Sequence, residues 1–160
     1  MERTVRENAV GVSVAGAMVL LASFLPWGTI RATPKLPFDT PGSPFGKNPF
    51  EAFSMKVDIT GWNGTSTLAG ITVPNWFTVA LAGMVVVIVW LRATDAWHPP
   101  KYLAPVLATV GLLQSMTVLL ALSTGEGGSV GIGVILAAVA FLGMAMASLR
   151  PPRAAPVPAV

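Results

Sequence analysis

Cysteine is absent from this chain, histidine occurs once, and charged residues are scarce. Charged residues make up 11% of the 160 residues, against about 25% in an ordinary soluble domain. Without cysteine, the chain can have no disulfide, thiolate metal site, cysteine nucleophile or cysteine-linked lipid. The single histidine, His98, has no second metal-ligating residue type close to it except Asp95. We therefore expect no metal centre, no cofactor and at most a local contact between these two side chains.

Long apolar runs dominate the sequence. Hydrophobic residues account for 53% of the chain, and the mean hydropathy is +0.68. Four runs contain no charged residue: 9–30, 74–91, 102–122 and 129–149. Each has about the 17–25 residues that a helix needs to cross a bilayer. The fold class that this pattern predicts is an all-α membrane protein, a bundle of four transmembrane helices.

The first run has an alternative interpretation as a signal peptide, because Arg3 and Arg6 precede it. Its apolar part is long for a signal peptide, and no small-x-small cleavage site follows it. We therefore interpret it as a membrane anchor.

Basic residues beside the runs predict the orientation in a cell membrane, because cytoplasmic loops are enriched in Lys and Arg. The segments 1–8, 92–101 and 150–160 are expected in the cytoplasm, the last as a disordered tail. The segments 31–73 and 123–128 are expected outside. Lys and Arg residues on the predicted cytoplasmic side are Arg3, Arg6, Arg92, Lys101, Arg150 and Arg153, whereas the long outer loop carries Arg31, Lys35, Lys47 and Lys56. Low Lys with abundant Ala, Val, Gly and Pro suggests a GC-rich bacterial genome, so the membrane that we expect is the bacterial inner membrane. The net charge is only +3, and the basic residues lie mainly at the edges of the apolar runs. We therefore expect the lipid bilayer as a partner and no nucleic acid.

Aromatic residues at the ends of the runs agree with this orientation, because Trp and Tyr gather at membrane interfaces. Those expected at the outer interface are Trp27, Trp76 and Phe77, and those expected at the inner interface are Trp90, Trp97 and Tyr102.

The long outer loop has two halves of different character. Its first half is rich in proline, which disfavours helix and strand, and it carries Phe38, Phe45 and Phe50. The second half alternates apolar and polar residues over 53–60, which is typical of a half-buried strand. Asn63-Gly64 then predicts a β-hairpin with a returning strand at 65–73. A third strand is expected from 27–33, which completes a small antiparallel β-sheet in the first extracytoplasmic loop.

The motifs LPWGTI (25–30) and TGWNGT (60–65) resemble the claudin-like four-helix membrane proteins. In that family a Trp follows the first helix, and a Gly-x-Trp motif lies in the first outer loop. Trp27 matches the first position and Trp62 the second, although Gly61 directly precedes Trp62 and the family's loop cysteines are absent. The chain also resembles small bacterial four-helix proteins with Pro-Trp after the first helix. The claudin-like resemblance implies a β-sheet from the first loop, cytoplasmic termini, and contacts of the outer sheet with partner proteins or with copies of the chain.

Reactive chemistry is sparse, and we expect no enzyme. All seven acidic residues lie outside the apolar runs, although proton-coupled transporters need ionisable groups inside the membrane. Gln114 is the one large polar side chain near the middle of a run, and an interhelical hydrogen bond is its expected role. The structural residues that we single out are Trp27, Gly61, Asn63, Gly64 and Gln114; the candidate partner contacts are Phe38, Phe45, Phe50 and Trp62.

Three functions compete on these observations. The first is a non-catalytic accessory or assembly subunit that binds other membrane protein subunits, or itself, through its helices and outer loop. Small residues spaced four apart, such as Gly11 with Ala15 and Gly143 with Ala147, favour close helix packing. The second is a small oligomeric channel or passive transporter. The third is a membrane enzyme acting on lipid or cell-wall precursors. The residues that would line the pore of a channel are Thr109, Gln114, Ser115 and Thr117. The acidic residues that could serve a membrane enzyme in the outer loop are Asp39, Glu51 and Asp58.

Overall fold

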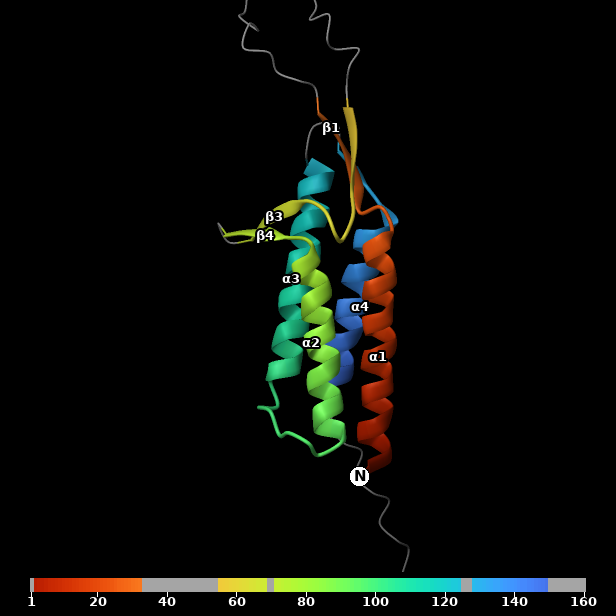
Figure 1. Ribbon diagram of the computed structural model, residues 1–160, viewed down its shortest axis with the longest axis vertical. Coiled ribbons are helices and arrows are strands. Elements are labelled where there is room, and N and C mark those ends of the chain that lie inside the picture. Colours follow the sequence, from red (N-terminus) through yellow and green to blue (C-terminus); the bar gives the residue numbers. More distant parts are fainter. Residues whose placement is uncertain (1, 33–54, 69–70, 125–127, 150–160) are drawn as a thin grey trace, which may run out of the picture.

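Four long helices form a bundle that carries short β-strands at one end (Figure 1). The computed structural model describes residues 2–32, 55–68, 71–124 and 128–149. Within these ranges each of the four helices is long and apolar enough to cross a membrane, so the expectation of four such helices is confirmed. The helices are α1 (Glu2–Phe24), α2 (Trp76–Ala93), α3 (Leu103–Thr124) and α4 (Ile132–Leu149). We call the end with the strands the sheet end and the opposite end, where residues 94–102 join α2 to α3, the loop end.

The helix ends differ from the predicted runs for local reasons. The first helix ends at Phe24 rather than at residue 30, because Pro26 lacks a backbone N–H and the residues from Gly28 onward pair as a strand. At its other end α1 extends back to Glu2 and so includes charged residues before the apolar run. The fourth helix begins at Ile132 rather than at 129, because residues 129–130 form another strand.

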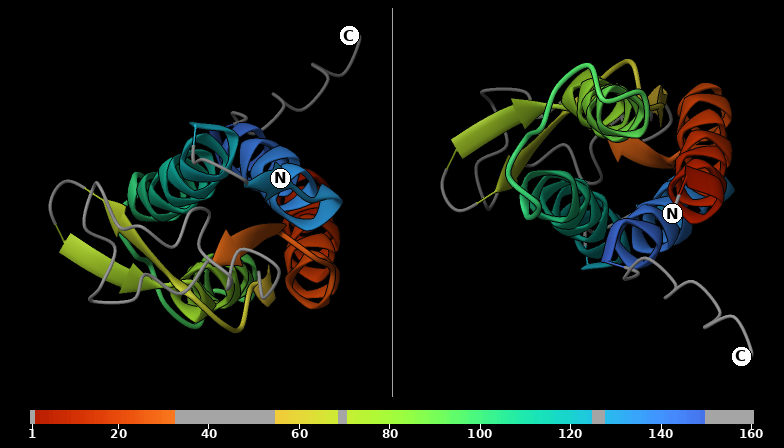
Figure 2. Two further views of the ribbon diagram at one scale, coloured as in Figure 1. Left: turned by 90° about the horizontal axis from the view of Figure 1, so that it is seen from above. Right: turned by 90° about the horizontal axis from the view of Figure 1, so that it is seen from below.

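Viewed along the bundle axis, the helices form a ring in the order α1, α4, α3, α2 (Figure 2). Two clusters of buried apolar side chains fill this ring. The larger cluster runs along the bundle and includes Val12, Val85 and Phe141. The second lies toward the sheet end and includes Trp27 and Leu122. The burial of apolar faces between the helices is what holds the helices in register.

The sheet at the end of the bundle has three strands in the order β2 (Met55–Ile59), β1 (Gly28–Ala32), β5 (Ser129–Val130). All pairings are antiparallel. The strand predicted from 27–33 is confirmed as β1, and it pairs with β2, which lies in the alternating segment 53–60. The third strand, β5, lies between α3 and α4, at residues that sequence analysis placed at the start of the fourth apolar run.

The predicted hairpin at Asn63-Gly64 is wrong. β3 (Thr65–Leu68) does not pair with β2 but with β4 (Ile71–Pro74), as a separate two-stranded sheet. A two-residue type I′ turn needs positive φ at both central residues, and among the described residues only Gly64 of this pair has it, at +86°. The segment 65–73, predicted as one returning strand, is therefore itself a hairpin that lies beside α2 and α3 (Figure 1).

Backbone hydrogen bonds explain why the chain turns away from β2. Trp27 N donates to Ile59 O at 2.7 Å, and Gly61 N donates to Ser23 O at 3.0 Å. These two bonds hold the end of β2 against the end of α1. Asn63 meanwhile accepts a hydrogen bond from Thr60 N through its Oδ1 at 2.6 Å. The asparagine thus closes a local turn with its side chain and does not occupy a hairpin corner.

Candidate functional site

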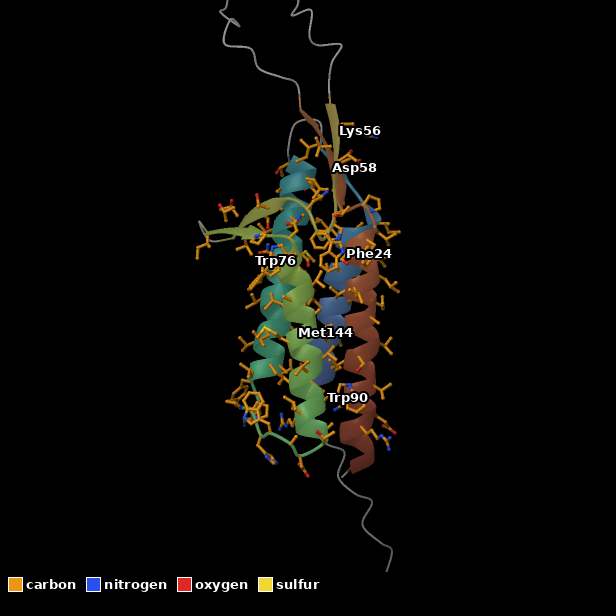
Figure 3. The ribbon with its side chains drawn as sticks, in the orientation of Figure 1. Phe24, Lys56, Asp58, Trp76, Trp90 and Met144 are labelled. Carbon is orange, nitrogen blue, oxygen red and sulfur yellow. The ribbon has the colours of Figure 1, made fainter. Side chains whose placement is uncertain are left out.

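Histidine and acidic side chains do not gather into a site in the part of the chain that the structure describes. No group of three or more His, Cys, Asp or Glu residues there is placed to hold a metal ion. The expected contact between His98 and Asp95 is confirmed, with Nε2 and Oδ1 3.3 Å apart and both side chains exposed. On β2, Lys56 and Asp58 lie at the sheet end (Figure 3). The surfaces and the buried polar groups therefore carry the functional argument.

The two tryptophans on which the claudin-like resemblance rests differ in exposure: Trp27 is buried and Trp62 is exposed. Trp27 is fully buried, and its Nε1 donates to Ala22 O at 2.9 Å. The expectation that it marks a membrane interface is therefore wrong, because its indole packs inside the bundle core at the sheet end. Trp62 is 46% exposed, and its ring lies 5.6 Å from that of Phe24 at a tilt of 47°. These two exposed rings form an aromatic surface beside the end of α1. The partner-contact candidates Phe38, Phe45 and Phe50 lie outside the described residues.

Gly61 and Gly64 occupy tight positions. A Cβ on Gly61 would lie 2.7 Å from the Cα of Ser23, so only glycine allows this approach of the loop to α1. Gly64 combines its positive φ with a close approach to Asn75. Asn63 adds a hydrogen bond from its Nδ2 to Asp58 O at 3.1 Å. All three residues shape the connection between the two sheets.

Asn75, at the start of α2, is a structural residue that sequence analysis missed. Its side chain does not cap the helix. Instead its Nδ2 donates to Thr60 O and to Asn63 O, at 3.2 and 2.9 Å. An asparagine directly before an apolar run is a helix-start signal, so the position was recognisable, but its bonds to a distant loop were not.

Gln114 lies near the middle of α3 in sequence. The helix α3 extends past the start of α2 toward the sheet end (Figure 1), and β3 packs against it. Gln114 is 1% exposed, and its Nε2 donates to Ser66 Oγ rather than to another helix. Among the described residues, no hydrogen-bond partner is present for its Oε1, nor for Asn75 Oδ1 and Thr78 Oγ1, which are also buried. The bond from Gln114 to Ser66 ties β3 to α3.

The outward side of the α1–α4 pair carries a groove of about 350 Å³. Small residues dominate its floor, and larger apolar side chains such as Val14 and Met146 stand exposed at its edges. Its lining residues are Gly11, Val14, Ala15, Met18, Val139, Ala140, Gly143, Met146 and Ala147. We call this surface the α1–α4 groove.

The glycines of the groove differ from those of the bundle interior. A Cβ on Gly16 would lie 2.6 Å from a methyl carbon of Val86, and one on Gly111 would overlap the Phe141 ring. These glycines are needed for packing within the chain. A Cβ on Gly11 or Gly143 would meet nothing within 4 Å. The contacts of this chain therefore do not account for glycine at the two groove positions.

Comparison of the chain with protein-family models, with curated protein sequences and with solved structures found no match.

Proposed function

We propose that this protein is a non-catalytic, multi-pass protein of the bacterial inner membrane that acts as an accessory or assembly subunit of a larger membrane complex. The support for membrane insertion is the set of four apolar helices. The loop end and both termini face the cytoplasm in this proposal. Arg6, Arg92 and Lys101 lie at the loop end, which agrees with the enrichment of basic residues in cytoplasmic segments.

The observation that carries the subunit role is the α1–α4 groove with its two unexplained glycines. Glycine inside a helix costs about 0.5–1 kcal/mol relative to alanine. In Gly16 and Gly111 that cost is offset by close helix packing. Gly11 and Gly143 have no such neighbour among the described residues. The same is true of Gly83, but only Gly11 and Gly143 share one surface, the α1–α4 groove, so we assign their neighbour to another protein.

A transmembrane helix is the occupant that fits this groove best. Glycine and alanine on both walls allow a third backbone to approach closely, which is how helices associate in lipid, where no hydrophobic force drives them together. The absence of charge among the lining residues matches an apolar helix. A partner helix would thus lie against α1 and α4 together.

The sheet end supplies a second contact region in this proposal. Phe24 and Trp62 present exposed rings there, and exposed aromatic surfaces mark protein contact sites. The claudin-like resemblance implies contacts through the same region. The channel alternative has less support, because two of its four expected pore residues, Gln114 and Ser115, are buried and donate hydrogen bonds within the chain.

The experiment is quantitative co-purification of the tagged protein from its native membranes in mild detergent. We expect a stoichiometric membrane partner with the unmodified chain. The double variant Gly11→Leu/Gly143→Leu fills the groove and should reduce recovery of that partner roughly tenfold, the effect of about 1.4 kcal/mol. The matched control is Gly83→Leu, because Gly83 on α2 also has open space around its Cβ position but does not line the groove.

Two results would count against the proposal. One is equal partner recovery with the groove variant and the control, which would remove the groove as the contact. The other is a protein found without any companion in native membranes. If the complex contains only copies of this chain, the helix that occupies the groove belongs to a second copy and not to a different protein.

A further inference from the structure

A cavity of about 290 Å³ opens at the loop end of the bundle, on the opposite half from the sheet. All four helices and the α2–α3 connection contribute to it. Its size is close to the lower limit of small-ligand pockets, about 300 Å³. Its lining residues are Asn8, Val12, Ile88, Val89, Arg92, Pro99, Pro100, Lys101, Tyr102, Ala104, Ala147, Ser148 and Leu149. We call it the loop-end pocket.

Apolar and polar residues separate along the depth of the loop-end pocket. Val12, Ile88 and Ala104 are buried core residues that form its deep wall. Arg92 lies one helical turn closer to the loop end than Ile88, and Lys101 lies in the connection that closes this end. The pocket therefore has an apolar interior and a basic mouth.

The two cations at the mouth are available for an anion. Among the described residues neither Arg92 nor Lys101 has a carboxylate within 4.0 Å. The nearest acidic residue in sequence, Asp95, contacts His98, and no acidic residue lines the pocket. Lys101 Nζ lies 4.9 Å from the centre of the Tyr102 ring, which holds it at the mouth.

We propose that the loop-end pocket binds an anionic phospholipid. The phosphate group would lie between Arg92 and Lys101, and the beginning of an acyl chain would lie against Val12, Ile88 and Ala104. This orientation matches that of a lipid in the cytoplasmic leaflet, with its headgroup at the membrane surface and its chain toward the bilayer centre. Basic pockets between helices on the cytoplasmic side are known to hold anionic headgroups. A small soluble anion would leave the apolar wall unused.

This inference rests on the proposed membrane insertion but not on the proposed partner. The test is native mass spectrometry of the purified full-length chain, titrated in detergent with phosphatidylglycerol or with phosphatidylcholine. We expect one phosphatidylglycerol to bind in preference to phosphatidylcholine. In the variant Arg92→Gln/Lys101→Gln the affinity for phosphatidylglycerol should fall about thirtyfold, since each basic group near a membrane surface contributes about 1 kcal/mol.

The control variant Arg6→Gln/Lys56→Gln removes the same net charge from positions that do not line the pocket, and it should bind like the unmodified chain. A second variant, Ala104→Leu, places a larger side chain on the deep wall and so narrows the pocket. It should weaken the binding of both lipids. Equal binding of the two lipids, or an equal loss in the control variant, would overturn the inference. A protein that does not fractionate with membranes would overturn the proposed function as well, so the two failures are distinguishable.

Discussion

Single residues at the close contacts decide how tightly this bundle packs. Gly111 faces the ring of Phe141, which is fully buried, and Gly61 faces the backbone of Ser23. Trp27 fills the sheet end of the core and satisfies its indole N–H with the carbonyl of Ala22. The space around these residues decides which side chain fits there. Trp62, the other tryptophan of the claudin-like resemblance, is by contrast half exposed.

The variant Gly111→Ala should destabilise the bundle by about 1–3 kcal/mol, because the added methyl would overlap the ring of Phe141, which is fully buried. Gly83→Ala is the matched control, since its methyl would meet nothing within 4 Å. The control should be neutral or stabilising by up to roughly 1 kcal/mol. The measurement is the unfolding midpoint of each detergent-solubilised variant, and equal midpoints for the two variants would contradict this account of packing.

At the scale of elements, the sequence predicted the helices better than the strand pairings. Each helix is specified by its own apolar run, so its existence can be read locally. The Asn63-Gly64 signal is also local, but Asn63 is bonded to Thr60 N, and β2 is held at the end of α1. The third strand, β5, has only two residues, too few for any periodic pattern. Its place beside β1 depends on the packing of α1 against α4, which no single segment encodes.

Because the natural chain has no cysteine, an introduced pair can test the strand order. Thr29 and Ser129 are register partners, and their hydroxyl oxygens are 2.6 Å apart. The variant Thr29→Cys/Ser129→Cys should form a disulfide under mild oxidation, since bridged Cβ atoms need a separation of only about 3.8 Å. Intact mass before and after reduction would detect it.

The control pair is Thr60→Cys/Thr67→Cys, which would face each other if the Asn63-Gly64 hairpin existed. In the observed topology the strands before and after that turn belong to different sheets, so this pair should remain reduced. Oxidation of the control pair with a reduced Thr29–Ser129 pair would reverse the strand assignment.

At the scale of the whole molecule, the two surface features are neighbours, because Ala147 lines both of them. The α1–α4 groove runs along the outward side of the bundle, and the loop-end pocket opens at one end. Sequence analysis recognised the small residues of the groove in pairs on each helix. It did not reveal that Gly11 and Gly143 line one surface, nor that Arg92 and Lys101 share a cavity, because these proximities arise only when distant helices pack. In the proposed role, a partner helix would occupy the groove and a phospholipid would occupy the loop-end pocket.

The most direct measurement of the partner-binding role is site-specific photocrosslinking in native membranes. A photoreactive aromatic residue replaces Val139, an exposed residue of the α1–α4 groove, or Val87, an equally exposed residue on α2 outside it. The account predicts a discrete adduct with another membrane protein from position 139 and none from position 87. Adducts of the same kind from both positions, or no adduct from position 139, would contradict it.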